Sequence, residues 1–118
     1  MNIEAFREYC LSKIGVEESF PFGPNTLVFK VLNKIFAIAS LDSEIFSANL
    51  KSDPEKAIAL RERYIEIQPG YHMNKKHWNT VNFEAGVHDN LLYELIDHSY
   101  DLVVRTLKKT DREKLKRL

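Results

Sequence analysis

The chain has 118 residues, of which 44% are hydrophobic and 29% are charged, and its formal net charge is zero. This composition is that of an ordinary folded protein and excludes a disordered chain. Because the net charge is zero, no global field draws the protein to nucleic acid or to a membrane, and electrostatic recognition must rest on local patches. The single cysteine, Cys10, excludes an internal disulfide and a cysteine-cluster metal site.

Hydrophobic periodicity and turn residues predict the elements in chain order. Apolar residues recur at helical spacing after Asn2, a suitable N-cap, and Gly15 is expected to end this first helix. Ser52 or Asp53 caps a second helix, with Pro54 in its first turn. The predicted elements are a helix at 3–14, strands at 26–31, 34–41 and 44–51, a helix at 52–64, a strand at 77–83 and a helix from about 89 to 107.

This order, α-β-β-β-α-β-α, lacks a regular strand–helix alternation and predicts an α+β fold in which helices pack on an antiparallel β-sheet. Leu32 and Asn33 separate the first two strands and predict a β-hairpin. No repeat or linker divides the chain, so residues 1–118 are expected to form one domain. No apolar stretch approaches the roughly 20 residues that span a bilayer, and the acidic start is unlike a signal peptide. We therefore expect a cytoplasmic protein without a membrane partner.

The charges are distributed unevenly along the chain. Residues 105–118 contain seven Lys/Arg and two Asp/Glu, an excess of 7 − 2 = +5, so the remaining residues carry −5. The chain therefore ends in a basic tail at about 108–118. Such cations complement the dipole of a helix carboxyl end. The alternative is a phosphate-binding arm, because lysine and arginine displace counterions from nucleic acid.

The segment PGYHMNKKHWNTV (69–81) holds the only tryptophan, Trp78, and the adjacent lysines Lys75 and Lys76. Two cations between a predicted turn and a strand are chemically able to hold phosphate oxygens. Exposed Tyr71 and Trp78 would be able to stack on the bases of a single strand. The simpler alternative is a solvated loop with Trp78 anchored in the core.

Signals for catalysis or metal binding are weak. His72 and His77 lie across a turn and lack the i, i+4 spacing of a zinc-binding helix. Cys10 lies on an apolar helical stripe, where a packed thiol is the ordinary case. No nucleophile elbow, phosphate-binding glycine loop or HExxH motif occurs. We expect no enzyme activity, no cofactor and no metal site.

The segments GYHMNKKHWNTV and HSYDLV resemble the MmcQ/YjbR family of small bacterial proteins, and weaker matches extend the resemblance over about residues 2–110. Asn33 stands where many relatives have glycine, and asparagine also tolerates a left-handed turn. The resemblance implies a CyaY-like (frataxin-like) α+β fold and DNA binding by a double-wing arrangement of β-hairpins. A frataxin-like fold also raises iron binding, but the first helix mixes Glu4 and Glu8 with Arg7 and Lys13 and has no carboxylate run.

We therefore expect a non-enzymatic protein that contacts DNA phosphates around residues 71–80. Lys75 and Lys76 would neutralise phosphates, and Trp78 would stack or, as we favour, anchor the loop. The expected nucleic-acid-binding residues are Lys51, Lys75, Lys76, His77, Asn79 and Thr80, with Tyr71 and Trp78 as stacking or anchoring residues. The alternative is an adaptor that binds another protein through these two aromatic residues. Steep salt dependence would distinguish phosphate binding from an apolar interface.

Overall fold

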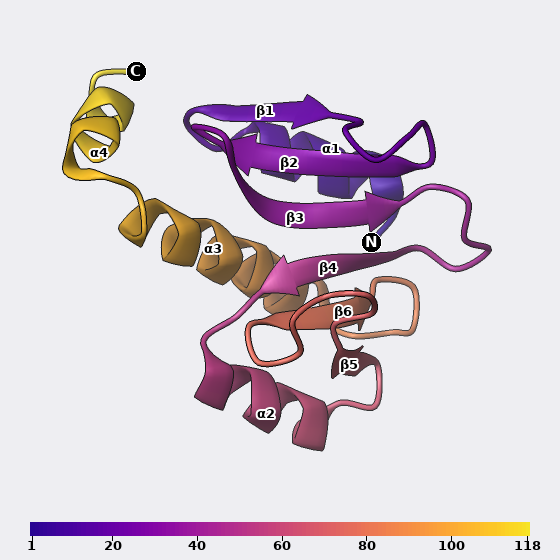
Figure 1. The fold of residues 1–118 in the computed structure, drawn as a ribbon. Coiled ribbons are helices and arrows are strands. Elements are labelled where there is room, and N and C mark those ends of the chain that lie inside the picture. The colour runs from indigo at the N-terminus through magenta and orange to yellow at the C-terminus, as the bar shows by residue number, and fades with distance from the viewer.

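The computed structural model describes all 118 residues, and its centre is a six-stranded sheet in the order β1-β2-β3-β4-β6-β5 (Figure 1). Every neighbouring pair of strands is antiparallel. This confirms the predicted α+β class with an antiparallel sheet and helices. The elements are α1 (Ile3–Leu11), β1 (Val16–Ser19), β2 (Thr26–Val31), β3 (Lys34–Ser40), β4 (Ser47–Lys51), α2 (Pro54–Arg63), β5 (Ile67–Pro69), β6 (Trp78–Asn82), α3 (Asp89–Arg105) and α4 (Lys109–Lys116).

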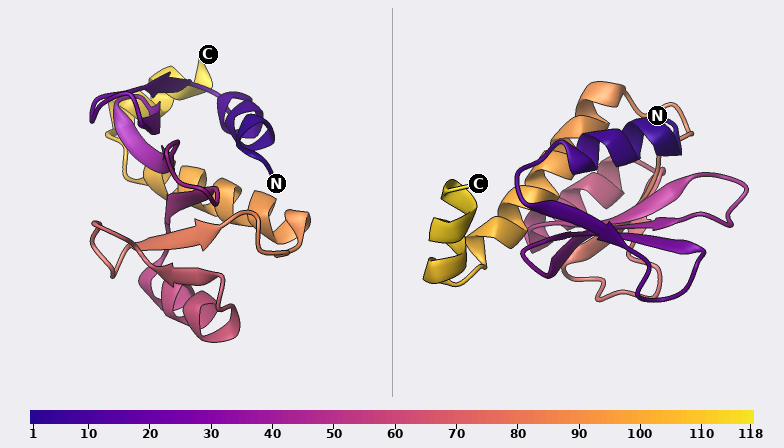
Figure 2. Two further views of the ribbon diagram at one scale, coloured as in Figure 1. Left: turned by 90° about the vertical axis from the view of Figure 1, so that its right-hand side faces the viewer. Right: turned by 90° about the horizontal axis from the view of Figure 1, so that it is seen from above.

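The helices α1, α2 and α3 cover one face of the sheet, and the other face is open. Figure 2 shows α1 and α3 on the same side of the strands, with α4 standing at one end. Buried residues of α1, α3 and the sheet share one cluster, and the ring of Phe6 packs edge-on against Phe46 and Phe83 at centroid distances of 5.2 and 5.0 Å. Such aromatic contacts stabilise a core beyond the area that they bury.

Most of the predicted local signals have the expected geometry. The side chain of Asn2 accepts a hydrogen bond from the amide of Ala5, and Asp53 caps α2 by accepting one from Lys56. Leu32 and Asn33 both have positive φ, 45° and 71°, which is the conformation of a tight type I′ hairpin turn. None of the helices is long and apolar enough to cross a membrane.

The sequence did not predict β1, β5 and α4. The strand β1 is short and carries two glutamates, and β5 has three residues and ends in proline, so neither has a strand pattern of its own. The predicted last helix, 89 to about 107, is confirmed as α3, which ends at the C-cap Thr106, and the unpredicted α4 begins at Lys109. The basic tail is therefore mostly helix.

Gly15 lets α4 pack against the sheet. Its φ of +75° is a left-handed conformation that glycine adopts without strain, and a Cβ there would lie 2.5 Å from Cδ1 of Leu115. Leu115 is the buried residue of α4 and belongs to the core cluster. The first helix ends earlier than predicted, at Leu11, and Ile14 is exposed.

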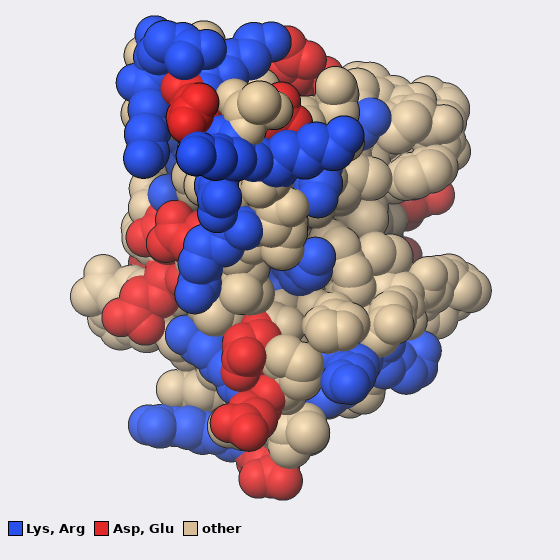
Figure 3. Space-filling view, turned by 60° about the vertical axis from the view of Figure 1, so that its left-hand side comes forward, with Lys and Arg blue, Asp and Glu red and all other residues tan.

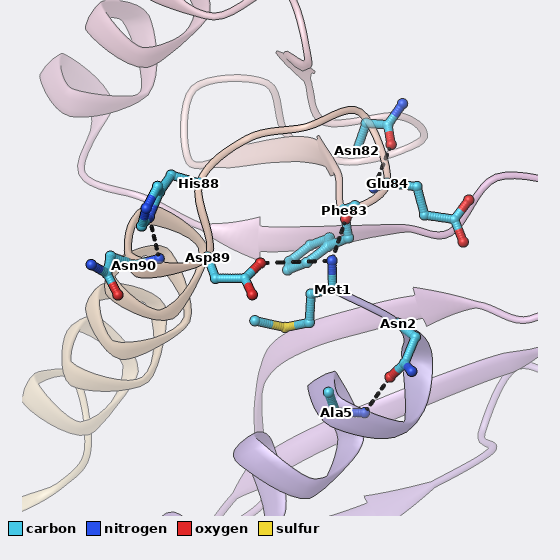
Figure 4. A network of polar contacts seen from close by, with 9 residues as sticks. All are labelled: Met1, Asn2, Ala5, Asn82, Phe83, Glu84, His88, Asp89 and Asn90. Carbon is cyan, nitrogen blue, oxygen red and sulfur yellow. Dashed lines mark hydrogen bonds and ion pairs between the residues drawn. The ribbon is translucent and has the colours of Figure 1, made fainter.

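The amino terminus closes the far end of the sheet (Figure 4). The amine of Met1 donates a hydrogen bond of 2.8 Å to the carbonyl of Phe83 and lies 3.8 Å from the carboxylate of Asp89. These contacts join α1 to the end of β6 and the start of α3. The hairpin tips and α4 lie at the opposite end of the sheet.

Candidate nucleic-acid interface

Two hairpin tips lie at the same end of the sheet. The β2–β3 turn closes where Val31 pairs with Lys34, and the β5–β6 loop (70–77) leads into Trp78, which pairs with Lys51 at the end of β4. Because β2 and β4 end at this end of the sheet and β3 and β6 begin there, both tips project from the same end (Figure 1). Their centres are three strand spacings apart, about 14 Å.

Between the tips, beside the end of β4, lies a cavity of about 400 Å³. It brings together three residues that the sequence predicts as functional, Lys51, His77 and Trp78. The start of α2 and the last turn of α3 complete it. Its lining residues are Lys51, Ser52, Asp53, Pro54, Asn74, His77, Trp78, Leu102 and Thr106.

The β5–β6 loop is shaped by Gly70 and Asn74. A Cβ on Gly70 would lie 2.8 Å from Cβ of Trp78, so only glycine allows the loop to approach β6 this closely. The carbonyl of Asn74 accepts hydrogen bonds from the amides of His77 and Trp78, and its side-chain oxygen accepts one from the amide of Lys76. The loop is thus a defined turn, and Trp78, which follows it, is half-buried.

The two adjacent lysines lie exposed on this turn. The ammonium of Lys75 donates to the carbonyl of Gly70 at 3.3 Å, and Arg61 of α2 donates to the carbonyl of Lys75 at 3.1 Å. The ammonium of Lys76 makes no contact of this kind. These bonds fix the backbone of the turn and leave both cations accessible to a ligand.

Buried α3 residues position Lys51. The amide of Lys51 donates to the hydroxyl of Ser99 at 2.8 Å, and that hydroxyl donates to the carbonyl of Phe36. Tyr100 donates to the carbonyl of Ile14. Ser99 and Tyr100 of the HSYDLV segment therefore make internal hydrogen bonds.

Asn79 and Thr80 point to opposite faces of β6. Asn79 is 2% exposed, and its side chain donates to the carbonyl of Ala57 in α2 at 3.3 Å. This burial argues against the predicted phosphate contact by Asn79, because a ligand has no access to its amide. Thr80 faces the open side, where its hydroxyl donates to the side chain of Asn49. Because successive side chains of a strand point to opposite faces, only Thr80 of this pair is accessible to a ligand.

His98, the first residue of the HSYDLV segment, also makes an internal hydrogen bond at this end of the molecule. Its Nε2 accepts a hydrogen bond of 3.2 Å from the amide of Asp53, the N-cap of α2. Burial lowers the pKa of His98, and the nearby cations Lys56 and Arg105 lower it further. The neutral imidazole therefore joins α3 to the start of α2.

Cations gather on this end of the molecule. Figure 3 shows Lys and Arg side chains over much of the upper part of the view, with Asp and Glu side chains among them there and in the lower part. Lys34 belongs to the β2–β3 tip, and its ammonium donates at 3.0 Å to the carbonyl of Thr106, a residue that lines the cavity. We define the cationic face as Lys34, Lys51, Lys56, Lys75, Lys76, Arg105, the basic residues of α4, and the flanking Lys108 and Arg117.

The other candidates for chemistry lie elsewhere. Cys10 is fully buried in the core, and burial raises the pKa of its thiol to about 12. The predicted packed thiol is confirmed. No group of three or more His, Cys, Asp or Glu side chains is placed to hold a metal ion.

The chain matches the family model described as YjbR over residues 11–102. It is 44% identical over 113 residues to the uncharacterized protein YbdF of Escherichia coli, covering 96% of this chain and 93% of that protein. It is 32% identical to the uncharacterized protein YjbR of Escherichia coli, over all of both chains.

Two solved structures have a similar fold. A crystal structure of a Deinococcus radiodurans protein with a DUF419 domain has a TM-score of 0.91 and 38% identity, covering 98% of this chain and 88% of that one. A crystal structure of a Pseudomonas syringae protein has a TM-score of 0.76 and 28% identity, covering 86% of this chain and 98% of that one.

Proposed function

This chain belongs to the YjbR family, and we propose that it is a non-enzymatic protein that binds DNA through phosphate contacts on its cationic face. The observation that carries the proposal is the placement of exposed Lys75 and Lys76 on a fixed turn, at the same end as the β2–β3 tip and the basic helix α4. Lysines held on a preformed surface lose less freedom when they meet a phosphate. Phosphate contacts supply most of the affinity in non-specific DNA binding.

The two tips fit the scale of a duplex. In this proposal the β5–β6 loop and the β2–β3 tip act as two wings, which is the arrangement that the family resemblance implies. Their spacing of about 14 Å compares with a major groove about 12 Å wide. Lys75 and Lys76 meet phosphates from one tip and Lys34 from the other, and Lys51 and His77 face the ligand between them. A CyaY-like fold and a cytoplasmic location are further parts of this proposal.

Tyr71 favours the alternative of a protein-binding adaptor, because this residue of the same loop is 70% exposed. Aromatic side chains are common anchors at protein interfaces. The two functions differ in salt dependence, since an apolar interface does not weaken steeply with ionic strength.

The test is fluorescence anisotropy of labelled duplex and single-stranded DNA at about 50 and 200 mM salt. We expect binding that weakens steeply with salt and falls at least tenfold in Lys75→Ala/Lys76→Ala. The control is Arg63→Ala, which removes an exposed cation at the far end of α2 and should leave the affinity nearly unchanged. Absence of binding at the lower salt, or equal losses in the two variants, would contradict the proposal.

A further inference from the structure

A second cavity, also of about 400 Å³, lies on the open face of the sheet. Its floor comes from β2, β3, β4 and β6, and its rim from the β1–β2 and β5–β6 loops. The lining residues are Phe22, Thr26, Ile38, Ser40, Ser47, Ala48, Asn49, Tyr71, His72, Met73 and Thr80. None of them is Lys, Arg, Asp or Glu, so the cavity suits an uncharged group with both apolar and hydrogen-bonding surface.

Exposed aromatic rings form part of the rim. Phe22 is 65% exposed and precedes β2, whereas Tyr71 follows β5. Because β2 and β5 lie on opposite sides of β3, β4 and β6 in the sheet, the two residues reach the cavity from opposite sides. Isolated exposed aromatics need no explanation, but two beside one neutral cavity offer stacking surfaces to a flat ligand. Hydroxyl groups and the Asn49 amide supply donors and acceptors between them.

The Tyr71 backbone is held in place by the sheet. Its amide donates to the hydroxyl of Thr80 at 2.9 Å, and its carbonyl accepts from the side chain of Asn49 at 3.3 Å. The next residue, His72, has a φ of 59°, which is strained for a residue with a side chain, and its ring lies 4.0 Å from that of Tyr71. The structure thus fixes the loop while leaving the Tyr71 ring exposed.

One loop connects this cavity to the cationic face. Tyr71, His72 and Met73 line the open-face cavity, whereas Asn74, His77 and Trp78 line the cavity between the tips. Lys75 and Lys76 lie within the second set in the chain, between Asn74 and His77, and directly follow the first. A ligand that is neutral and planar at one end and anionic at the other matches both sides of the loop.

We propose that the open-face cavity receives an unstacked base of a single-stranded nucleic acid whose phosphates lie on the cationic face. This inference rests on the proposed function and extends it to the form of nucleic acid that is preferred. Paired bases in a duplex keep their faces stacked, so only a single strand can place a base between Phe22 and Tyr71.

The test compares two labelled single strands of about 12 nucleotides, one of thymidines and one of abasic residues with the same phosphates, at about 50 mM salt. We expect the wild type to bind the thymidine strand about tenfold more tightly. The variant Phe22→Ala/Tyr71→Ala should bind both strands as weakly as the wild type binds the abasic one. Ile65→Ala, which removes an exposed apolar side chain outside the cavity, should keep the preference.

Nuclear magnetic resonance locates the contact independently of the variants. The thymidine strand should shift the amide signals of Asn49, Tyr71 and Thr80 in the wild type, and the abasic strand should not. Equal affinity for the two strands, or a preference that survives in the double variant, would overturn this inference while leaving the phosphate contacts intact. Failure of both strands to bind would overturn this inference, and failure of the duplex to bind as well would overturn the proposed function.

Discussion

His98 shows how a single residue couples the charge of this end to its fold. The amide of Asp53 donates to its Nε2, which only the neutral imidazole can accept. The charged groups that surround it are Asp53, Lys56, Asp101 and Arg105, and burial is the first cause of its lowered pKa. A pKa that is lower in the folded state than in the unfolded chain stabilises the fold above the unfolded value and ceases to do so as the pH falls.

We therefore expect the unfolding free energy of the wild type to fall when the pH drops below about 6.5, the ordinary histidine value. His98→Gln should show a smaller fall, because glutamine accepts a hydrogen bond at any pH. Urea unfolding at about pH 7.5 and pH 5.5 measures the fall in unfolding free energy of the wild type and of the variant. His72→Gln, a change on the exposed loop, is the control and should follow the wild type. An equal fall in all three proteins would exclude His98 as the cause.

Asn79 separates a structural role from a binding role. Because its side chain is buried and donates to the carbonyl of Ala57, we expect Asn79→Ala to lower the unfolding free energy by about 1–2 kcal/mol. DNA affinity of the folded variant should stay within about twofold of the wild type. Urea unfolding and anisotropy measure the two quantities. A large loss of affinity without a loss of stability would contradict this structural role and support the phosphate contact that the sequence predicts.

At the scale of elements, α4 is the part that the sequence described least well. Its charge was visible, but only Leu115 among its residues is buried, and one apolar side chain gives no readable period. Its docking depends on Gly15, 100 residues away in the chain. A long-range contact between a glycine and a leucine has no signal in a single sequence.

Gly15→Ala should loosen α4. A Cβ at this position collides with Leu115, and the left-handed φ costs an alanine about 1–2 kcal/mol of conformational free energy. Gly86→Ala is a matched control, because Gly86 also has a positive φ but a Cβ there meets open space. Hydrogen exchange of the α4 amides should quicken in Gly15→Ala and not in Gly86→Ala. Equal exchange in both variants would show that α4 does not rest on Gly15.

The helices α1 and α2 and the strands β2, β3, β4 and β6 follow from periodicity, caps and turn residues. The sequence also brought together most of the candidate site, because Lys75, Lys76, His77 and Trp78 are neighbours in the chain. It missed the inward turn of Asn79, since alternation alone does not say which face of β6 is covered. It also missed the open-face cavity, because only the sheet topology places Phe22 and Tyr71 on the rim of the same cavity.

For the whole molecule, the central feature is the separation of charge within a neutral chain. The excess of +5 in residues 105–118 lies in α4 and the residues that flank it, at the same end as the hairpin tips, and the −5 of the remainder is spread over the rest. A zero net charge therefore does not prevent local attraction of phosphates, because fields decay within a Debye length of about 10 Å at 0.1 M salt.

The most direct test of the account is the salt dependence of DNA binding by the wild type. Each neutralised phosphate contributes about −0.9 to the slope of log K against log salt concentration for a duplex. Contacts by Lys51, Lys75 and Lys76 alone predict a slope of about −3, and α4 makes it steeper. A slope near zero, or no measurable binding at about 50 mM salt, would contradict phosphate recognition on the cationic face and favour a protein partner.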